Sequence, residues 1–172
     1  MNKLEFWEII KNQNIKSTIK DFDLNKLLSF QDVLASQIRE LFIPQIGEIF
    51  YLIQNLKNLD EFETAKYIST DGFLDFRAWI ISCGKTTFID FLTFKHESKI
   101  LKYQLSSQCY NPDLPFLVEN IIDSKFEEKD KTNINYHFDN DYDQLYSKIQ
   151  WDQLYDKYDL LISHLKTILN EK

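Results

Sequence analysis

Only three glycines and three prolines occur among the 172 residues of this chain. A protein with many β-strands needs a turn roughly every 8–12 residues, and glycine and proline supply many of those turns. The chain has too few of either for that class of fold. Helices need fewer such residues, so their scarcity favours an all-α protein.

The spacing of apolar residues points the same way. Between Leu24 and Phe42 they recur every three or four residues, which predicts a long amphipathic helix with one buried stripe. Asp23 stands where the first turn of that helix needs a capping side chain, and Pro44 suits the first turn of the next helix. A stripe from Trp151 to Leu169 predicts a C-terminal helix of about five turns.

We expect a single, mainly helical domain over residues 1–172, an irregular bundle of about seven to nine helices. One short extended segment is predicted near 134–138, where apolar and polar residues alternate. The remaining predicted helices are shorter and cover residues 2–10, 44–56, 60–68, 70–84, 86–92, 98–105 and 113–128.

The charge of the chain argues against nucleic acid as a partner. Its 27 acidic residues outnumber its 20 lysines and arginines, giving a net charge of -7, whereas a phosphate backbone attracts basic proteins. The best local basic patch consists of Lys95, Lys99 and Lys102. It is interleaved with His96 and Glu97 and contains no arginine. This composition is more typical of a solvated helix face than of a surface that binds nucleic acid.

Nothing in the sequence predicts a membrane protein. No apolar run approaches the ~20 residues that a bilayer-spanning helix needs. The first ten residues contain two glutamates and no small-residue cleavage site, so they do not resemble a signal peptide. The two cysteines, Cys83 and Cys109, stand in unlike contexts, which predicts reduced thiols and a cytoplasmic protein.

Sequence patterns for cofactor and metal sites are incomplete. Residues 84–86 resemble the end of a phosphate-binding loop, but Trp79 stands where that loop needs its first glycine. The alternating aspartates of 139–143 resemble a calcium loop, but Gln144 and Gln150 replace its glycine and its final glutamate. The three histidines lie far apart in the sequence. We therefore expect no metal or other cofactor and assign no catalytic residue.

The predicted helix at 70–84 carries the residues of greatest interest. Thr70 or Asp71 can cap its start, and Gly84 can end it in the left-handed conformation. At about 100° per residue, one narrow polar strip collects four side chains. They are Asp71, Asp75, Ala78 and Ser82.

Arg77 falls inside the apolar arc of this helix, beside Phe73. The chain has eighteen lysines and only two arginines, so a lysine would be expected wherever any positive charge is sufficient. An arginine at this position therefore indicates an interaction that only a guanidinium makes, either bidentate pairing or stacking on an aromatic ring. A structural ion pair is one explanation, and a clamp on an anionic ligand with Trp79 as a wall is the other. Asp71 and Asp75 are likewise explained by capping and solvation, or by acid–base or metal chemistry. These four residues are the candidate contacts for a ligand or partner.

The block DGFLDFRAWIISCGK, with Ser69 before it, resembles the signature of the bacterial domain-of-unknown-function 4240 family, SDDGF-x-DFR-x-W-L-I-x-x-G. Thr70 stands where that pattern has aspartate, and Ile80 where it has leucine. Further similarity lies at Phe6 and Trp7, at residues 126–129 and around Trp151. The resemblance implies a bacterial, cytoplasmic, mainly helical protein, and it implies no reaction because the family has no established activity.

We expect a non-catalytic interaction module, either an adaptor or an immunity-type protein, rather than an enzyme. After residue 122, eleven acidic residues face seven lysines, and an acidic surface steers basic partners toward it. The expected partner is thus an unidentified protein, with a basic one favoured. The alternative is a small-ligand binder or enzyme that uses Asp71, Asp75 and Arg77, with the guanidinium facing a cleft. A nucleic-acid-linked regulator is the weaker alternative, because it has to overcome the charge.

Overall fold

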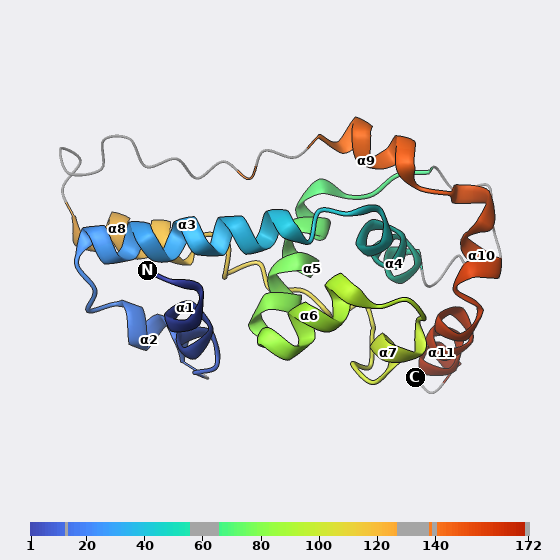
Figure 1. The fold of residues 1–172 in the computed structure, drawn as a ribbon, viewed down its shortest axis with the longest axis horizontal. Helices are drawn as coiled ribbons and strands as arrows, with labels where there is room; N and C mark the ends of the chain where they lie inside the picture. Colours follow the sequence, from blue (N-terminus) through green and yellow to red (C-terminus); the bar gives the residue numbers. More distant parts are fainter. Residues whose placement is uncertain (13, 56–65, 127–137, 139–140, 171–172) are drawn as a thin grey trace.

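The computed structural model describes residues 1–12, 14–55, 66–126, 138 and 141–170. These residues form eleven α-helices and one short 3-10 helix, and they contain no strand (Figure 1). The predicted all-α fold is therefore confirmed. The number of helices exceeds the expected seven to nine because the helices at Ile15–Ile19 and Tyr142–Lys148 were not predicted, and because the predicted C-terminal helix is divided into Leu154–Lys157 and Asp159–Asn170.

The helices follow one another along the chain as α1 (Lys3–Ile10), α2 (Ile15–Ile19), α3 (Leu24–Glu40), α4 (Pro44–Gln54), α5 (Thr70–Ser82), α6 (Lys85–Thr93), α7 (Ser98–Leu101), α8 (Leu117–Lys125), α9 (Tyr142–Lys148), the 3-10 helix (Trp151–Gln153), α10 (Leu154–Lys157) and α11 (Asp159–Asn170). In Figure 1 the molecule is elongated, with α1, α2, α3 and α8 toward one end. Helices α4, α9, α10 and α11 lie toward the other end, and α5 and α6 lie between the two groups.

Helix α3 begins as the sequence predicts, because the Asp23 side chain accepts the backbone N–H of Lys26 at 2.8 Å. The centre of its apolar stripe is buried, with Leu27, Leu34 and Ile38 at 0% exposure, and Leu24 and Leu28 are partly buried. Helices α1, α5 and α8 all pack against α3. The buried apolar side chains of the described residues form one continuous core around it.

The C-terminal stripe does not form the single helix predicted for it. The helix is broken at Tyr158, whose backbone has φ -125° and ψ 39°. The Tyr158 hydroxyl donates to the buried carboxylate of Glu48 at 2.7 Å, and Glu97 accepts the backbone N–H groups of Leu160 and Leu161 at 2.8 Å each. These two distant carboxylates fix the break, because Glu97 satisfies amide groups that would otherwise bond within a continuous helix.

Two other helix predictions were too long. Helix α8 begins at Leu117 rather than at residue 113, because the Asn111 side chain accepts the N–H of Leu114 at 3.1 Å and forms a turn there. Helix α7 ends at Leu101 rather than at residue 105, and Gln104 adopts a positive φ of 50°.

Two predictions fall largely outside the described residues. Of the short helix expected at 60–68, residues 66–68 are described and are not helical, and of the extended segment near 134–138 only Phe138 is described. Helices α2 and α9 were not predicted. None of the helices described here has both the length and the apolarity needed to cross a bilayer.

Candidate functional site

Helix α5 begins at a cap that differs from the predicted one. Ser69, rather than Thr70 or Asp71, is the N-cap, and its hydroxyl accepts the N–H of Gly72 at 3.2 Å. The N–H of Ser69 donates to the side chain of Gln54 at 3.0 Å, which ties the end of α4 to the start of α5. Asp71 lies in the first turn, where its carboxylate meets the positive end of the helix dipole.

The other end of α5 agrees with the prediction. Gly84 has φ +97°, a backbone conformation that glycine adopts without strain, and it separates α5 from α6. Gly72 has a different role, because a Cβ atom there would lie 3.0 Å from the ring of Phe50. The missing side chain lets α5 approach α4 closely.

Arg77 is fully buried between α5 and the end of α3. Its Nε donates to the carbonyl oxygen of Phe73 and its Nη1 to that of Ile38, both at 3.2 Å. The guanidinium carbon also lies 4.7 Å from the ring centre of Phe73 and 5.1 Å from that of Phe42. The described contacts of Arg77 thus combine main-chain carbonyl dipoles with two aromatic rings.

Burial lowers the pKa of Arg77 to about 10, and interaction with Tyr142 opposes part of that decrease. The guanidinium therefore stays charged at neutral pH. A fully buried guanidinium does not face the open cleft that the ligand-clamp hypothesis requires. The geometry of Arg77 favours a structural role, in which it joins α5 to α3.

Trp79 lies on a different side of α5 from the polar strip. Its ring stacks on Phe76, with ring centres 5.7 Å apart and an interplanar angle of 12°, and it meets Phe91 of α6 edge-on. Trp79 is half-buried in this contact. Its described contacts therefore pack α5 against α6.

A pocket of about 350 Å³ opens beside the first half of α5. Helix α4, helix α5 and the segment at 106–110 enclose it, and we call it the α5 pocket. Its lining residues are Phe50, Ile53, Gln54, Ser69, Gly72, Asp75, Ser106, Ser107, Cys109 and Tyr110. The pocket therefore combines an apolar floor from α4 with hydroxyl groups and one carboxylate.

Asp75 supplies that carboxylate, and its surroundings are acidic. Partial burial raises the pKa of Asp75, and the nearby carboxylates of Asp71 and Asp113 raise it further. Among the described residues, no lysine or arginine lies within ion-pair distance of these three aspartates. The structure thus brings Asp71 and Asp75 together at one acidic edge and places Arg77 and Trp79 elsewhere.

The segment at 106–110 is a wall of the pocket that the sequence did not reveal. The backbone N–H of Asn111 donates to the carbonyl oxygen of Asp75 at 3.0 Å, which holds this segment against α5. The Sγ atom of Cys109 accepts the N–H of Ser106 at 3.3 Å and shapes the turn. Tyr110 leaves 58% of its surface exposed at the pocket edge. The sequence predicts a loop at Asn111 and Pro112, but it does not show which helix that loop contacts.

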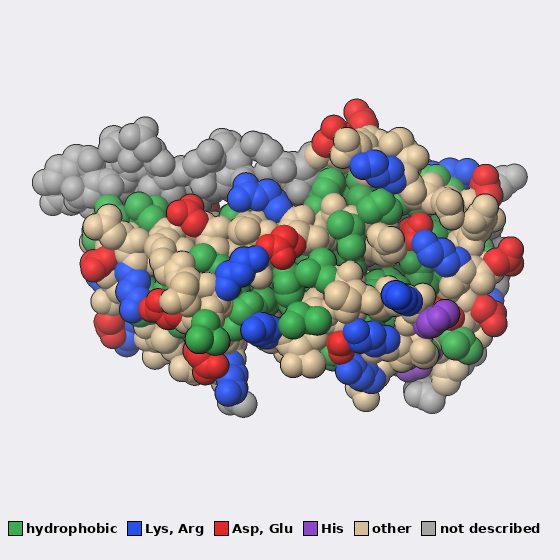
Figure 2. Space-filling model, viewed as in Figure 1, with side chains coloured by type: hydrophobic (Ala, Val, Ile, Leu, Met, Phe, Trp, Pro, Cys, Tyr) green, Lys and Arg blue, Asp and Glu red, His purple; other side chains and the backbone are tan. Residues whose placement is uncertain are grey.

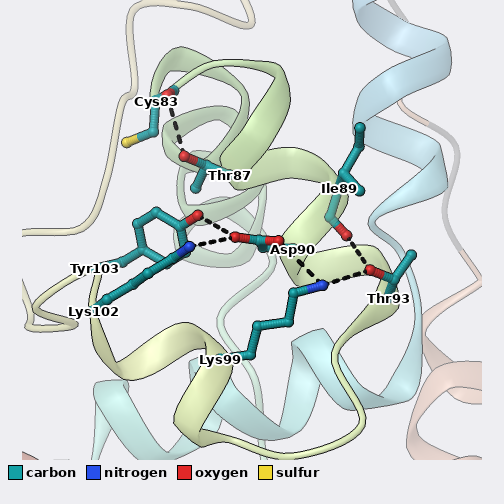
Figure 3. A network of polar contacts seen from close by, with 8 residues as sticks. All are labelled: Cys83, Thr87, Ile89, Asp90, Thr93, Lys99, Lys102 and Tyr103. Atoms are coloured by element: carbon teal, nitrogen blue, oxygen red, sulfur yellow. Dashed lines mark hydrogen bonds and ion pairs between the residues drawn. The ribbon is translucent and has the colours of Figure 1, made fainter.

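Asp90 of α6 forms the centre of a second polar network (Figure 3). Its carboxylate accepts the hydroxyl of Tyr103 at 2.6 Å and pairs with Lys102 at 2.8 Å and Lys99 at 3.1 Å. Hydrogen bonds from Lys102 and Tyr103, more than any other contact, hold the pKa of Asp90 well below its usual range. Two of the three lysines in the predicted basic patch are therefore paired with this aspartate.

Within the part of the chain that the structure describes, no group of three or more His, Cys, Asp or Glu side chains is arranged to hold a metal ion. Both cysteines are free thiols. Burial raises the pKa of Cys83 to about 11, and it also raises the pKa of Cys109. Both shifts disfavour the thiolate, which is the nucleophilic form, although Cys83 is exposed.

The fold and the pocket define an all-α protein with a small acidic recess beside its fifth helix. The chain belongs to the family described as protein of unknown function (DUF4240), whose model matches residues 1–97. This match confirms the family that the block in α5 indicated. It includes all of α5 and ends before the segment at 106–110. No curated protein and no solved structure matches the chain.

Proposed function

We propose that this protein is a non-catalytic interaction module, an adaptor or immunity-type protein, that binds a basic protein partner through the α5 pocket. The supporting observation is the acidic edge at Asp71, Asp75 and Asp113, which has no ion-paired lysine or arginine among the described residues. It lies beside an apolar floor formed by Phe50 and Ile53. A lysine or arginine side chain suits both, because its stem packs on apolar surface while its charge meets a carboxylate.

The net charge of -7 supports the same partner, since an acidic surface accelerates its encounter with a basic protein. We propose a bacterial, cytoplasmic location, with which the two free thiols agree. An enzyme that uses Arg77 as a ligand clamp gains no support from a guanidinium with 0% exposure. A nucleic-acid-linked regulator gains little from a basic patch in which Lys99 and Lys102 pair with Asp90.

A small cationic ligand is the second candidate occupant of the α5 pocket. The volume of about 350 Å³ favours it, because small-molecule sites begin at about 300 Å³. In this case Asp75 and Asp71 bind the ligand and no partner protein is needed. Native mass spectrometry of the protein purified from its own host distinguishes the two candidates, since a bound small molecule adds a defined mass.

Quantitative affinity capture from a lysate of the host tests the protein partner. The baits are the unmodified chain, Asp75→Asn and the control Asp156→Asn. Asp156 is an exposed aspartate on α10 without an ion-paired lysine or arginine among the described residues. We expect one basic protein to be retained by the unmodified chain and by the control, to be released by salt, and to be reduced about fivefold on Asp75→Asn. Equal recovery on all three baits, or no reproducible partner, contradicts the proposal.

A further inference from the structure

A second cavity, of about 440 Å³, lies between the connection from α6 to α7 and the helices α10 and α11. The connection contributes residues 94–98, so we call this space the 94–98 cavity. It is larger than the α5 pocket and falls within the range of about 300–1,000 Å³ that small-molecule sites occupy. In Figure 2, lysine and histidine side chains lie side by side at the lower right of the molecule, over α7 and α11.

The carboxylates of this region already have partners. Both oxygens of Glu97 accept backbone N–H groups from the start of α11, at 2.8 Å each. Beneath the cavity, Glu48 is 1% exposed, and its Oε2 accepts from Lys157 at 2.6 Å and from Tyr158 at 2.7 Å. Both carboxylates keep their negative charge, but the two oxygens of Glu97 and Oε2 of Glu48 already accept hydrogen bonds from the protein.

Several hydrogen-bond donors remain at the cavity wall. Lys95, His96 and Ser98 are exposed, and no described carboxylate lies within ion-pair distance of Lys95. Lys157 also lines the cavity with 39% of its side chain exposed, and its ammonium group has two donors beyond the one directed at Glu48. The wall therefore presents more hydrogen-bond donors than its own acceptors use.

The backbone that carries these donors is tied to neighbouring elements at two points. On the α7 side, the Lys99 ammonium lies 3.1 Å from Asp90 and donates to the hydroxyl of Thr93 at 3.0 Å (Figure 3). Two residues earlier, Glu97 bonds to the start of α11. A backbone that is already fixed loses less conformational entropy when a ligand binds.

We propose that the 94–98 cavity binds a small organic anion, a carboxylate or phosphate monoester on an aromatic or short aliphatic body. Lys95 and Lys157 supply the charge, and His96 and Ser98 donate hydrogen bonds to the anionic oxygens. Phe94 and Leu160 line the same space and provide apolar surface for the body of the ligand. The cavity has no arginine in its lining, so it favours a single anionic group over a polyphosphate that needs bidentate contacts. This site is independent of the partner proposed for the α5 pocket.

Titration of the full chain with phenyl phosphate and with inorganic phosphate, followed by NMR of the backbone amides, tests this site. We expect phenyl phosphate to bind more tightly than inorganic phosphate and to shift the amides of 94–98 and 157–160. Lys95→Gln weakens phenyl phosphate binding about fivefold, which is the effect of one partly exposed charge pair. The control Lys85→Gln, an exposed lysine at the start of α6, leaves binding unchanged.

Glu97→Gln provides a test of opposite sign. It removes a negative charge from the cavity wall, so it tightens phenyl phosphate binding about threefold, while the weaker cap on α11 lowers the melting temperature. A purely structural Glu97 changes only the melting temperature. The proposal is overturned if phenyl phosphate does not bind below about 10 mM, if Lys95→Gln behaves like Lys85→Gln, or if a poly-glutamate peptide binds at these residues and phenyl phosphate does not.

Discussion

Arg77 and Asp90 lie on consecutive helices and carry opposite charges, and the fold accommodates them in different ways. The guanidinium of Arg77 is fully buried, and its described contacts include main-chain carbonyls, aromatic rings and Tyr142. The carboxylate of Asp90 sits at an edge, where two flexible lysines and a tyrosine hydroxyl reach it. The described contacts of Arg77 need its planar guanidinium, whereas those of Asp90 pair charges at a partly exposed edge. We expect salt and acidic pH to weaken the contacts of Asp90 more than those of the buried Arg77.

Arg77→Lys is the variant with the largest expected effect. Lysine has no planar group to bridge the carbonyls of Phe73 and Ile38 or to stack on a ring, so a buried charge loses much of its compensation. We expect the free energy of unfolding to fall by about 3 kcal/mol, measured by urea denaturation. Arg39→Lys is the matched control, because Arg39 is the other arginine and is exposed. A loss below about 1 kcal/mol at Arg77 contradicts the structural role.

Asp90→Asn has an intermediate expected effect, a loss of about 1.5 kcal/mol at neutral pH and low salt. Asparagine still accepts the hydroxyl of Tyr103 but no longer pairs with Lys99 and Lys102. The folded protein holds the pKa of Asp90 below its unfolded value of about 3.9, so the stability that Asp90 adds is present above that pH. It is lost as the pH falls below about 4, toward the lower pKa of the folded state.

Thermal unfolding of the unmodified chain and of Asp90→Asn at about pH 7 and about pH 3 measures this contribution. The difference in melting temperature between the two proteins shrinks at the lower pH and at high salt. Asp32→Asn, an exposed aspartate on α3, serves as the control. A difference that stays constant with pH and salt shows that Asp90 acts through packing rather than charge.

Asp75→Asn has the smallest expected effect on stability, and unlike the two preceding variants it is expected to raise the free energy of unfolding. The folded state raises the pKa of Asp75, so the ionised form is less favourable in the folded protein than in the unfolded chain at neutral pH. We expect asparagine to raise the free energy of unfolding by about 0.5 kcal/mol or less. A gain in stability together with a loss of partner capture is typical of a residue kept for binding. A clear loss of stability assigns Asp75 to the fold instead.

The sequence predicted features that arise from local interactions. The cap at Asp23, the start of α4 at Pro44 and the positive φ at Gly84 all depend on residues a few positions apart. The sequence placed Arg77 in an apolar arc but left open whether its guanidinium is buried or faces a cleft. Its partners were not predicted, because the carbonyl of Ile38 belongs to the main chain and has no signature in the sequence.

Long-range contacts account for what sequence reasoning missed. The break at Tyr158 depends on Glu48 and Glu97, which lie far away in the chain. The third wall of the α5 pocket depends on a backbone bond from Asn111 to Asp75. Periodicity describes one helix at a time, so it shows neither kind of contact. The sequence therefore predicted only one of the three walls of the α5 pocket, namely the helix that carries Asp75.

The bonds from Glu97 to the first amides of α11 also bear on how the molecule assembles. The start of this C-terminal helix is set by a residue that is synthesised more than sixty positions earlier, and not by a capping side chain of its own. A helix of 12 residues is marginal in water without tertiary contacts. During translation the acceptor is thus made before the helix that needs it, and α11 gains these hydrogen bonds only when tertiary packing brings its start to Glu97.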